Sequence, residues 1–391
     1  MIYLALPTGA AHGWGIVGMG LARAMGRLAP GHVRLLTAPF TPDSVGDELV
    51  YRDLAALLPR PGESGAQPAG GVNLLDGPLV TCAADKQFNS AAPQWRGRPT
   101  VCHAVFEENI FQPEWLAKGR QYDIIATAST WCTKVLTDYG MAGVQTAIQG
   151  IDPAVFFPLP AELADGVRDF LRDQFVIFSG GKFEYRKAQD VVIRAVKVLQ
   201  DRHKDVVLVN AWFNPWPQSF ETMRASPYLA WPAASGQYVE VMTRLLAHNG
   251  LDMSRVITMG PRTNALMARI YRNSDVGLFP NRSEGGTNLV MMEYMACGKP
   301  VVAVDSTGQN DVIKEGHALV IKTKGEVALN GPAGPVARWP EPDLDDALAK
   351  LEWAYQHRAE MAALGVKAGE TMRQHFTWAD TARAFLKILG Q

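Results

Sequence analysis

Two glutamates flank a glycine-rich turn in the second half of the sequence: Glu284 opens the turn, and Glu293 follows it in a helix-forming stretch. A carboxylate can accept hydrogen bonds from two neighbouring hydroxyl groups, which is what a ribose or a hexose offers. Gly285 and Gly286 carry no Cβ, so a ligand can approach their backbone closely. The amides of the following helical turn suit an anion such as phosphate. The pattern predicts a nucleotide-sugar site; the alternative is an ordinary strand-to-helix turn with a surface glutamate.

Regular elements on both sides must position this turn. Val276–Pro280 reads as a buried strand and its exit, and Val301–Val304 as the next strand. The stretch Asn288–Cys297 between them is rich in helix formers, with Thr287 or Asn288 as its N-cap. The predicted unit is therefore strand, turn, helix, strand.

A second candidate is a basic loop that follows the predicted strand Phe175–Phe178. It places Lys182, Arg186 and Lys187 close together behind two glycines. Holding these cations in one loop is costly unless an anion lies between them. The loop therefore predicts a diphosphate-binding segment, and the alternative is a solvated basic loop.

The first half opens on a strand, a loop over 7–15 and a helix over 16–28. Gly13, Gly15 and Gly18 spell the pattern G-x-G-x-x-G. Dinucleotide binding would require an acidic residue at the end of the next strand, but Val33–Ala38 ends without one. A dehydrogenase is therefore disfavoured. Gly15 remains either in a loop that approaches a ligand or in a turn that merely requires glycine.

Two further residues of the first half have side chains suited to sugar binding. Trp14 stands between two glycines, a poor place for core packing and a plausible platform for a sugar ring. His103 falls at the end of the predicted strand Thr100–Phe106, the edge at which open α/β sheets bind ligands. The alternative is a histidine whose hydrogen bonds are satisfied by the backbone.

Composition excludes several classes of protein. The 391 residues suffice for two domains, and 38 basic residues balance 39 acidic ones, which argues against nucleic-acid and anionic-membrane partners. The four cysteines form no C-x-x-C pair, so we expect reduced, buried thiols. The first residues read as a strand rather than a signal peptide, and no apolar run approaches the ~20 residues of a membrane span. We therefore expect a cytoplasmic protein without a transmembrane segment.

A formal D-x-D pattern, Asp343-Leu-Asp345, is used by metal-dependent transferases of another fold. Here it opens a predicted helix over 346–356, so N-capping is the favoured interpretation, and we predict no metal site. The preceding stretch, Asn330–Pro342, is rich in proline and glycine and is expected to form a loop.

The turn between the two glutamates resembles a family signature. Glu-Gly-Gly-x-x-Leu-x-x-x-Glu-x-Met-Ala-x-Gly-x-Pro-Val is similar to the donor-site motif of the retaining GT-B glycosyltransferases related to sucrose and mannosyl transferases, glycosyltransferase family four (glycosyl transferases group one). Eight residues separate Glu284 from Glu293, one more than is usual in that family, and the turn could absorb the extra residue. The resemblance is strong over 123–391 and looser over 1–110.

The resemblance implies an α/β fold in the GT-B arrangement, with two Rossmann-like doubly wound domains facing a cleft. Residues 1–157 would form the acceptor-side domain and 158–391 the nucleotide-sugar donor domain. A linker helix is expected over 161–173. The last helix, about 378–391, would cross back to the N-terminal domain.

The resemblance also implies residue roles. Lys182 and Lys187 match the cations that hold the donor diphosphate, Gly260-Pro-Arg262 resembles the segment that flanks the base, and His103 would face the sugar. The predicted catalytic residues are Glu284, His103 and Lys187, and the predicted acceptor-side residues are Trp14 and His103. The predicted donor-binding residues are Gly15, Lys182, Lys187, Arg262, Glu284, Gly285, Gly286, Thr287, Asn288, Leu289 and Glu293.

The predicted activity is a retaining, metal-independent transfer of a sugar from a nucleoside-diphosphate sugar to an acceptor in the cleft, with no cofactor. The donor stays open among UDP-, GDP- and ADP-sugars, and the acceptor among sugars, glycans, lipid-linked compounds and small molecules. The alternatives are a GT-B sugar-nucleotide epimerase or phosphorylase, and a non-catalytic nucleotide-sugar binding protein.

Overall fold

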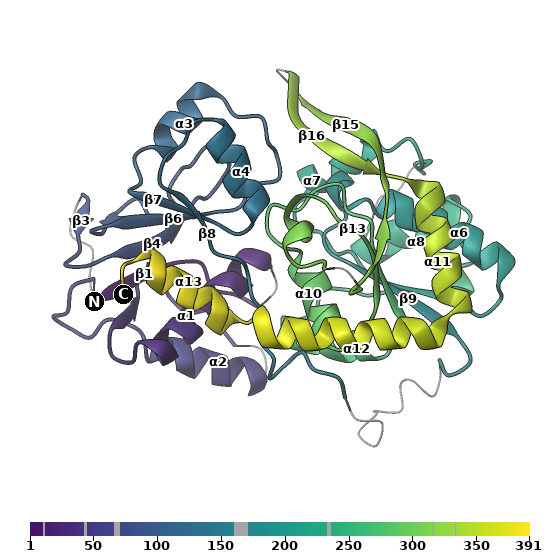
Figure 1. Cartoon of the computed structure of the whole chain (residues 1–391), viewed down its shortest axis with the longest axis horizontal. Helices are drawn as coiled ribbons and strands as arrows, with labels where there is room; N and C mark the ends of the chain where they lie inside the picture. Colours follow the sequence, from purple (N-terminus) through teal and green to yellow (C-terminus); the bar gives the residue numbers. More distant parts are fainter. Residues whose placement is uncertain are drawn as a thin grey trace. The chain divides into compact units, whose positions relative to one another are not determined.

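The computed structural model describes residues 1–10, 12–42, 45–65, 71–159, 171–232, 236–314, 316–332 and 334–391 (Figure 1). The chain divides into two compact units. The first unit comprises Met1–Asp152, Gly285–Leu289 and His375–Gln391, and the second comprises Pro153–Glu284 and Val290–Gln374. The expected linker helix falls largely on 160–170, outside the described residues.

The first unit is built on a six-stranded parallel sheet with the order β2-β1-β4-β6-β7-β8. In Figure 1, α1, α2 and α13 lie on one face of this sheet and α3 and α4 on the other. The elements of this unit are β1 (Ile2–Ala5), α1 (Gly13–Leu28), β2 (Val33–Leu35), α2 (Val45–Ala55), β3 (Asn73–Leu74), β4 (Leu79–Cys82), β5 (Trp95–Arg96), β6 (Thr100–Ala104), α3 (Pro113–Gly119), β7 (Ile124–Thr127), α4 (Thr130–Asp138), β8 (Val144–Thr146) and α13 (Trp378–Ile388).

The second unit repeats the architecture, with the strand order β11-β10-β9-β12-β13-β14 and parallel pairing throughout. Its elements up to the fourth strand are β9 (Phe175–Gly180), η2 (Tyr185–Lys187), α6 (Gln189–Arg202), β10 (Val206–Ala211), α7 (Pro217–Glu221), η3 (Thr222–Ala225), α8 (Tyr238–His248), η4 (Met253–Arg255), β11 (Val256–Thr258), α9 (Asn264–Arg272) and β12 (Val276–Phe279). The remaining elements are α10 (Leu289–Ala296), which starts in the loop grouped with the first unit, β13 (Val301–Val304), η5 (Thr307–Asp311), β14 (Leu319–Ile321), β15 (Thr323–Gly331), β16 (Gly334–Pro342), α11 (Leu344–Gln356) and α12 (Arg358–His375).

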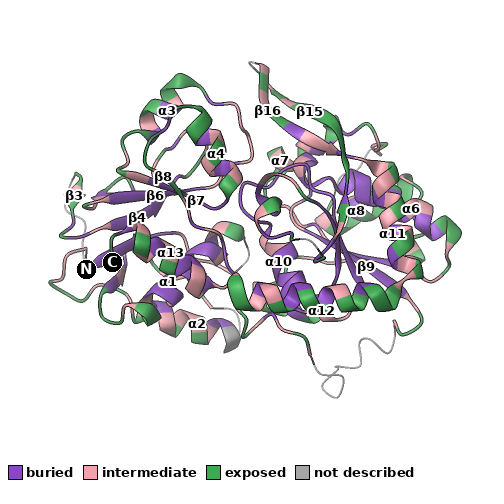
Figure 2. Ribbon diagram, in the orientation of Figure 1, coloured by how far each residue is buried: buried purple, intermediate pink, exposed green. Residues whose placement is uncertain are grey.

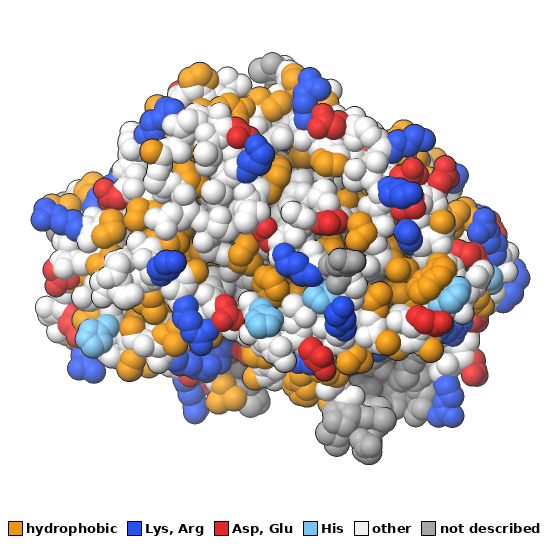
Figure 3. Space-filling view, in the orientation of Figure 1, with side chains coloured by type: hydrophobic (Ala, Val, Ile, Leu, Met, Phe, Trp, Pro, Cys, Tyr) orange, Lys and Arg blue, Asp and Glu red, His pale blue; other side chains and the backbone are white. Residues whose placement is uncertain are grey.

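Both sheets are buried on both faces, which is why their strands read as apolar runs rather than as alternating patterns. Figure 2 shows the central strands of each six-stranded sheet in the colour of buried residues, and the outer helices as mixed. The four cysteines are also buried, as expected, and form no disulfide with one another; burial raises the pKa of Cys82 and Cys297 to about 12. On the face shown in Figure 3, acidic and basic side chains are interspersed, in keeping with the balanced charge. Among the described helices, none combines the length and the apolar character needed to cross a membrane.

One expectation about the second unit is wrong. The stretch expected as a loop, Asn330–Pro342, instead supplies most of an antiparallel hairpin in which Val327 pairs with Trp339. The prolines of β16 suggested a loop because proline lacks a donor. A two-stranded ribbon tolerates them, since each strand has only one neighbour and half of its amides need no partner strand. The hairpin extends away from the rest of its unit in Figure 1.

Helix caps agree with the sequence in three places. Ser129 accepts a hydrogen bond from the Cys132 amide at the start of α4, and Thr377 and Asp380 form a reciprocal capping box at the start of α13. Asp343 accepts hydrogen bonds from the amides of Asp345 and Asp346. The D-x-D pattern is therefore a helix N-cap, as predicted.

Candidate functional site

The strand order places the candidate site in the second unit. The chain runs from β9 outward to β10 and β11, then returns to the other side of β9 with β12. Open α/β sheets bind ligands at such a reversal, outside the carboxyl ends of the two strands. The loops that leave these ends are Gly181–Lys187 after β9 and Pro280–Glu284 after β12. They contain the predicted Lys182, Lys187 and Glu284.

Glu284 lies at the centre of a buried ionic cluster. Its carboxylate accepts hydrogen bonds from Lys187 Nζ (2.5 Å to Oε1) and from Arg186 Nη1 (3.0 Å to Oε2), and a further one from the Asn281 amide. Burial alone would raise the pKa of Glu284, but the charges of Lys187 and Arg186 hold it below its ordinary value. Glu284 is therefore ionised, although only 4% of its surface is exposed.

The cations of the basic loop surround a second carboxylate. Arg186 Nη2 lies 2.6 Å from Glu184 Oε1, and Lys182 Nζ lies 3.4 Å from the same oxygen. Lys182 is the most exposed of the three cations, and its ammonium also lies 4.8 Å from the ring centre of Trp216. Burial lowers the pKa of Lys187, while Glu284 opposes that shift. The structure therefore brings Lys182, Arg186 and Lys187 together, with the carboxylates of Glu184 and Glu284 as their partners.

The segment Gly285–Leu289 groups with the first unit. The Ser129 hydroxyl donates to the Gly285 carbonyl (2.7 Å), and the Thr287 amide donates to Gln149 Oε1 (3.2 Å). A Cβ on Gly286 would lie 2.2 Å from that oxygen, so the Gln149 side chain could not keep this position beside a larger residue. Asn288 has a φ of 60°, a left-handed conformation that asparagine adopts more readily than most residues. Helix α10 then begins at Leu289, so Asn288 lies directly before the helix, at one of the two predicted N-cap positions.

Glu293 lies on α10 in a separate polar cluster. Its two oxygens accept hydrogen bonds from the Asn264 amide (2.7 Å) and the Tyr271 hydroxyl (3.2 Å). Burial raises the pKa of Glu293 to about 8, although both hydrogen bonds oppose the shift. The predicted Arg262 precedes Asn264 by two residues; it is exposed and donates to the Pro261 carbonyl.

In the first unit, the G-x-G pattern lies in a helix and not in a loop. Helix α1 begins at Gly13, capped by His12 Nδ1, which accepts a hydrogen bond from the Gly15 amide (3.0 Å). A Cβ on Gly15 would lie 2.5 Å from the Gly9 carbonyl oxygen, so this glycine has a packing reason. The expectation that Trp14 is poorly placed for core packing is wrong, because its ring is partly buried against the core of the unit.

His103 is buried within β6, between the rings of Trp14 and Phe385, at centroid distances of 6.0 and 5.5 Å. Its Nδ1 lies 3.0 Å from the Ala126 carbonyl oxygen; since a carbonyl can only accept, Nδ1 carries the proton. Burial lowers the pKa of His103 to about 4. Its Nε2 is also buried and has no hydrogen-bond partner within the described part of the chain, so the neutral imidazole keeps an unused acceptor nitrogen.

Several site residues escaped the sequence analysis: Glu184, Asn264, Asn281 and Arg282. Arg282 carried a signal, because a guanidinium directly after a buried strand and two residues before Glu284 needs buried carboxylates. Its partners lie far away in sequence, so the sequence alone did not identify them. Within the described ranges, no group of three or more His, Cys, Asp or Glu side chains is arranged to hold a metal ion.

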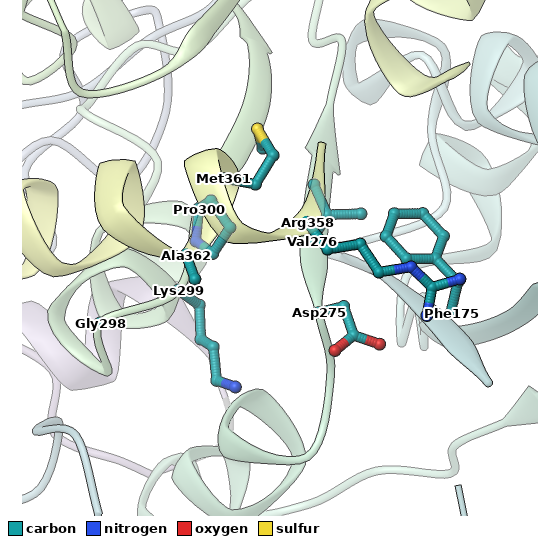
Figure 4. A pocket seen from close by; sticks show the side chains of 9 residues that line it. All are labelled: Phe175, Asp275, Val276, Gly298, Lys299, Pro300, Arg358, Met361 and Ala362. Carbon is teal, nitrogen blue, oxygen red and sulfur yellow. The ribbon is translucent and has the colours of Figure 1, made fainter. Parts of the chain in front are cut away.

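A small hollow lies at the opposite ends of the same strands (Figure 4). Phe175 begins β9 and Val276 begins β12, so the hollow lies at the amino ends, away from the ionic cluster. Arg358, which lines it, contacts Asp205 (2.7 Å) and the Phe175 ring, 5.0 Å from its centre. These contacts give Arg358 a structural role.

Comparisons with known proteins relate this chain to glycosyltransferases. Residues 174–330 match the family described as Glycosyl transferases group 1. The chain is 28% identical over 276 residues to a D-inositol 3-phosphate glycosyltransferase of Stackebrandtia nassauensis, which covers 68% of this chain and 54% of the relative. It is 25% identical over 246 residues to a GDP-mannose-dependent alpha-(1-6)-phosphatidylinositol monomannoside mannosyltransferase of Mycolicibacterium smegmatis, covering 60% and 58%. The chain thus spans about half the length of the curated relatives it matches.

Solved structures agree on the fold. The Anabaena protein HepE, solved in complex with UDP-glucose, superposes with a TM-score of 0.65 over 100% of this chain and 99% of that one, at 14% identity. The prediction of two Rossmann-like halves is therefore confirmed. Residues 174–330 thus resemble the glycosyl transferases group 1 family, and the chain has the two parallel-sheet halves of the GT-B fold.

Proposed function

We propose that this protein transfers a sugar from a nucleoside-diphosphate sugar to an acceptor, with retention of anomeric configuration and without a metal ion. The observation that carries the proposal is the position of Lys187, Arg186 and Glu284 at the carboxyl ends of the adjacent strands β9 and β12. The family match and the named activities of the relatives support the same class of donor.

The cations would act on the leaving group. As the bond between the sugar C1 and the phosphate oxygen breaks, its electron pair stays on the diphosphate, and negative charge grows there. Lys182, Arg186 and Lys187 carry fixed positive charge next to that position, and the amides at the start of α10 add partial positive charge. The acceptor oxygen bonds to C1, and its proton passes to the departing diphosphate.

The two glutamates would bind different parts of the donor, Glu293 the ribose and Glu284 the hexose. Glu293, whose oxygens already accept from Asn264 and Tyr271, has further lone pairs for the ribose hydroxyls. Glu284 stays ionised and would orient the hexose hydroxyls or face the positively charged carbon. In the first unit, the acceptor nitrogen of His103 and the ring of Trp14 would contact the transferred sugar or the acceptor.

Binding and turnover test the proposal separately. We expect calorimetry with UDP, GDP, ADP and their nucleosides to identify one diphosphate that binds with much higher affinity than its nucleoside. Lys187→Ala should remove this difference in affinity. The corresponding nucleotide-sugar should then be consumed only with an acceptor. Turnover without an acceptor would indicate an epimerase, dependence on inorganic phosphate a phosphorylase, and binding without turnover a non-catalytic protein; each outcome would overturn the proposal.

A further inference from the structure

Arg282 uses all the hydrogen-bond donors of its side chain. Its guanidinium is fully buried, and all five of its N–H groups donate. Nε and Nη2 donate to Glu341 (2.5 and 2.8 Å), and Nη1 and Nη2 donate to the two oxygens of Asp190 (2.9 Å each). The remaining N–H donates to the Tyr185 carbonyl (2.8 Å), and the guanidinium lies 3.9 Å from the centre of the Tyr185 ring.

The partners of Arg282 come from three different elements. Asp190 lies in the first turn of α6, Tyr185 in the basic loop and Glu341 near the end of β16, at the base of the hairpin. Burial would lower the pKa of Arg282, but the carboxylates of Asp190 and Glu341 raise it, so the charge is permanent. A bidentate guanidinium fixes direction as well as distance, which a lysine could not do.

Backbone hydrogen bonds connect Arg282 to the residues of the candidate site. The amides of Arg282 and Ser283 both donate to the Arg186 carbonyl (2.8 and 3.1 Å). In return, Arg186 Nη1 donates to the Ser283 carbonyl (3.2 Å) and to Glu284. The segments 184–187 and 281–284 are therefore held against each other at the residues that carry the cations and the carboxylate.

We propose that Arg282 is a positioning residue for donor binding: clamped between Asp190 and Glu341, it sets the spacing of Arg186 and Lys187 that the donor diphosphate requires. The inference rests on the proposed function, because it assigns the diphosphate to these cations. It also assigns a role to the base of the hairpin, since Glu341 supplies half of the clamp.

The test compares two substitutions in the clamp with one outside it. Arg282→Lys keeps the charge but loses the fork of donors, and Glu341→Gln replaces one carboxylate while Asp190 remains. The control is Arg255→Lys, in the same unit: the Arg255 side chain is 13% exposed and contacts Asp252 (2.8 Å) and the carbonyls of His203 and Gln200. The readout is the affinity ratio between a nucleoside diphosphate and its nucleoside, for whichever of UDP, GDP and ADP the parent protein binds most tightly.

We expect both clamp variants to lower this ratio about tenfold, with nucleoside affinity within about twofold of the parent. A general loss of folded protein would lower the apparent affinity for both ligands equally and leave their ratio unchanged. This is the result expected for Arg255→Lys if it destabilises the unit. An unchanged ratio in folded Glu341→Gln overturns the inference, whether or not Arg282→Lys folds, and so does an equal fall in the control. If the parent protein binds the diphosphate no more tightly than the nucleoside, the proposed donor site is wrong, and the role of Arg282 that rests on it is wrong too.

Discussion

Lys187 and Glu284 lie 97 residues apart in the sequence and form a buried ion pair with an Nζ–Oε1 distance of 2.5 Å. The same carboxylate contacts Arg186. Two cations that would bind a diphosphate are therefore already in contact with an anion, and a bound diphosphate must share them with Glu284.

Glu284→Gln should therefore bind the free nucleoside diphosphate about tenfold more tightly (about 1.4 kcal/mol), because the competing negative charge is gone. Sugar transfer should fall in the same variant, since the uncharged amide no longer stabilises positive charge at the reacting carbon. Calorimetry beside initial rates measures both effects. Glu326→Gln, on the exposed strand β15, is the control. Weaker diphosphate binding in Glu284→Gln would contradict the competition between the two anions.

Glu293 should make the stability of the protein depend on pH. Its pKa is about 8 in the folded protein and about 4.3 in an unfolded chain. Between these values the folded protein binds more protons, so the free energy of unfolding falls as the pH rises from about 4.5 to 8 and then levels off with respect to this group. The full effect is on the order of a few kcal/mol.

Urea unfolding at several pH values measures this slope. Glu293→Gln should remove the contribution, while the exposed Glu370→Gln should retain it. If Glu293→Gln and the parent lose stability in parallel between pH 5 and 8, the buried carboxyl is not the titrating group.

His103 offers a pair of substitutions that separate its two nitrogens. His103→Asn can keep the hydrogen bond to the Ala126 carbonyl while removing the acceptor at Nε2, and His103→Gln places an acceptor nearer to that position. We expect transfer to fall at least about tenfold in the asparagine variant, less in the glutamine variant, and nucleotide affinity to stay within about threefold in both. Trp14→Phe should behave like His103→Asn. Loss of nucleotide binding from a folded variant would put the donor site elsewhere.

Gly20 should be required for the packing of α13 on α1. A Cβ at Gly20 would lie 2.3–2.7 Å from atoms of the Trp378 ring, whereas a Cβ at Gly13, on the same helix, would meet nothing within 4 Å. Gly20→Ala should cost about 1–3 kcal/mol through overpacking, and Gly13→Ala should be neutral or slightly stabilising. Denaturant titration of the two variants measures their free energies of unfolding. If Gly20→Ala is as stable as Gly13→Ala, the Trp378 ring can move aside.

Turnover should survive chelation. In the proposed mechanism, lysine and arginine side chains and helix amides stabilise the leaving diphosphate, so EDTA should leave the initial rate unchanged. Loss of activity with EDTA, restored by magnesium or manganese, would contradict the metal-free mechanism.

The elements of the second unit could be predicted closely where local signals agree. Strand β13 runs over Val301–Val304 as expected, because its short apolar run is rich in valine and directly follows a proline. Strand β16 was missed because its prolines are typical of loops, and only its partner β15 makes it a strand. The periodicity of a segment contains no information about which distant segment pairs with it.

The residues of the candidate site were likewise predicted only where the signal is local in the sequence. Glu284, Glu293 and Lys187 were predicted because motif and spacing are local. The clamp around Arg282 was not, because it joins residues 92 and 59 positions away in the sequence. The burial of His103 also depends on Phe385, which comes from the last helix of the chain.

The buried cysteines have a practical consequence. A thiol reacts with maleimides and disulfides as the thiolate, and Cys82 and Cys297, with pKa values of about 12, are almost entirely protonated at neutral pH. All four native thiols are also shielded from reagents by burial. A cysteine introduced at an exposed position, for example Lys324→Cys on β15, would therefore be labelled selectively, and a fluorophore there could report on the hairpin without first removing the native cysteines.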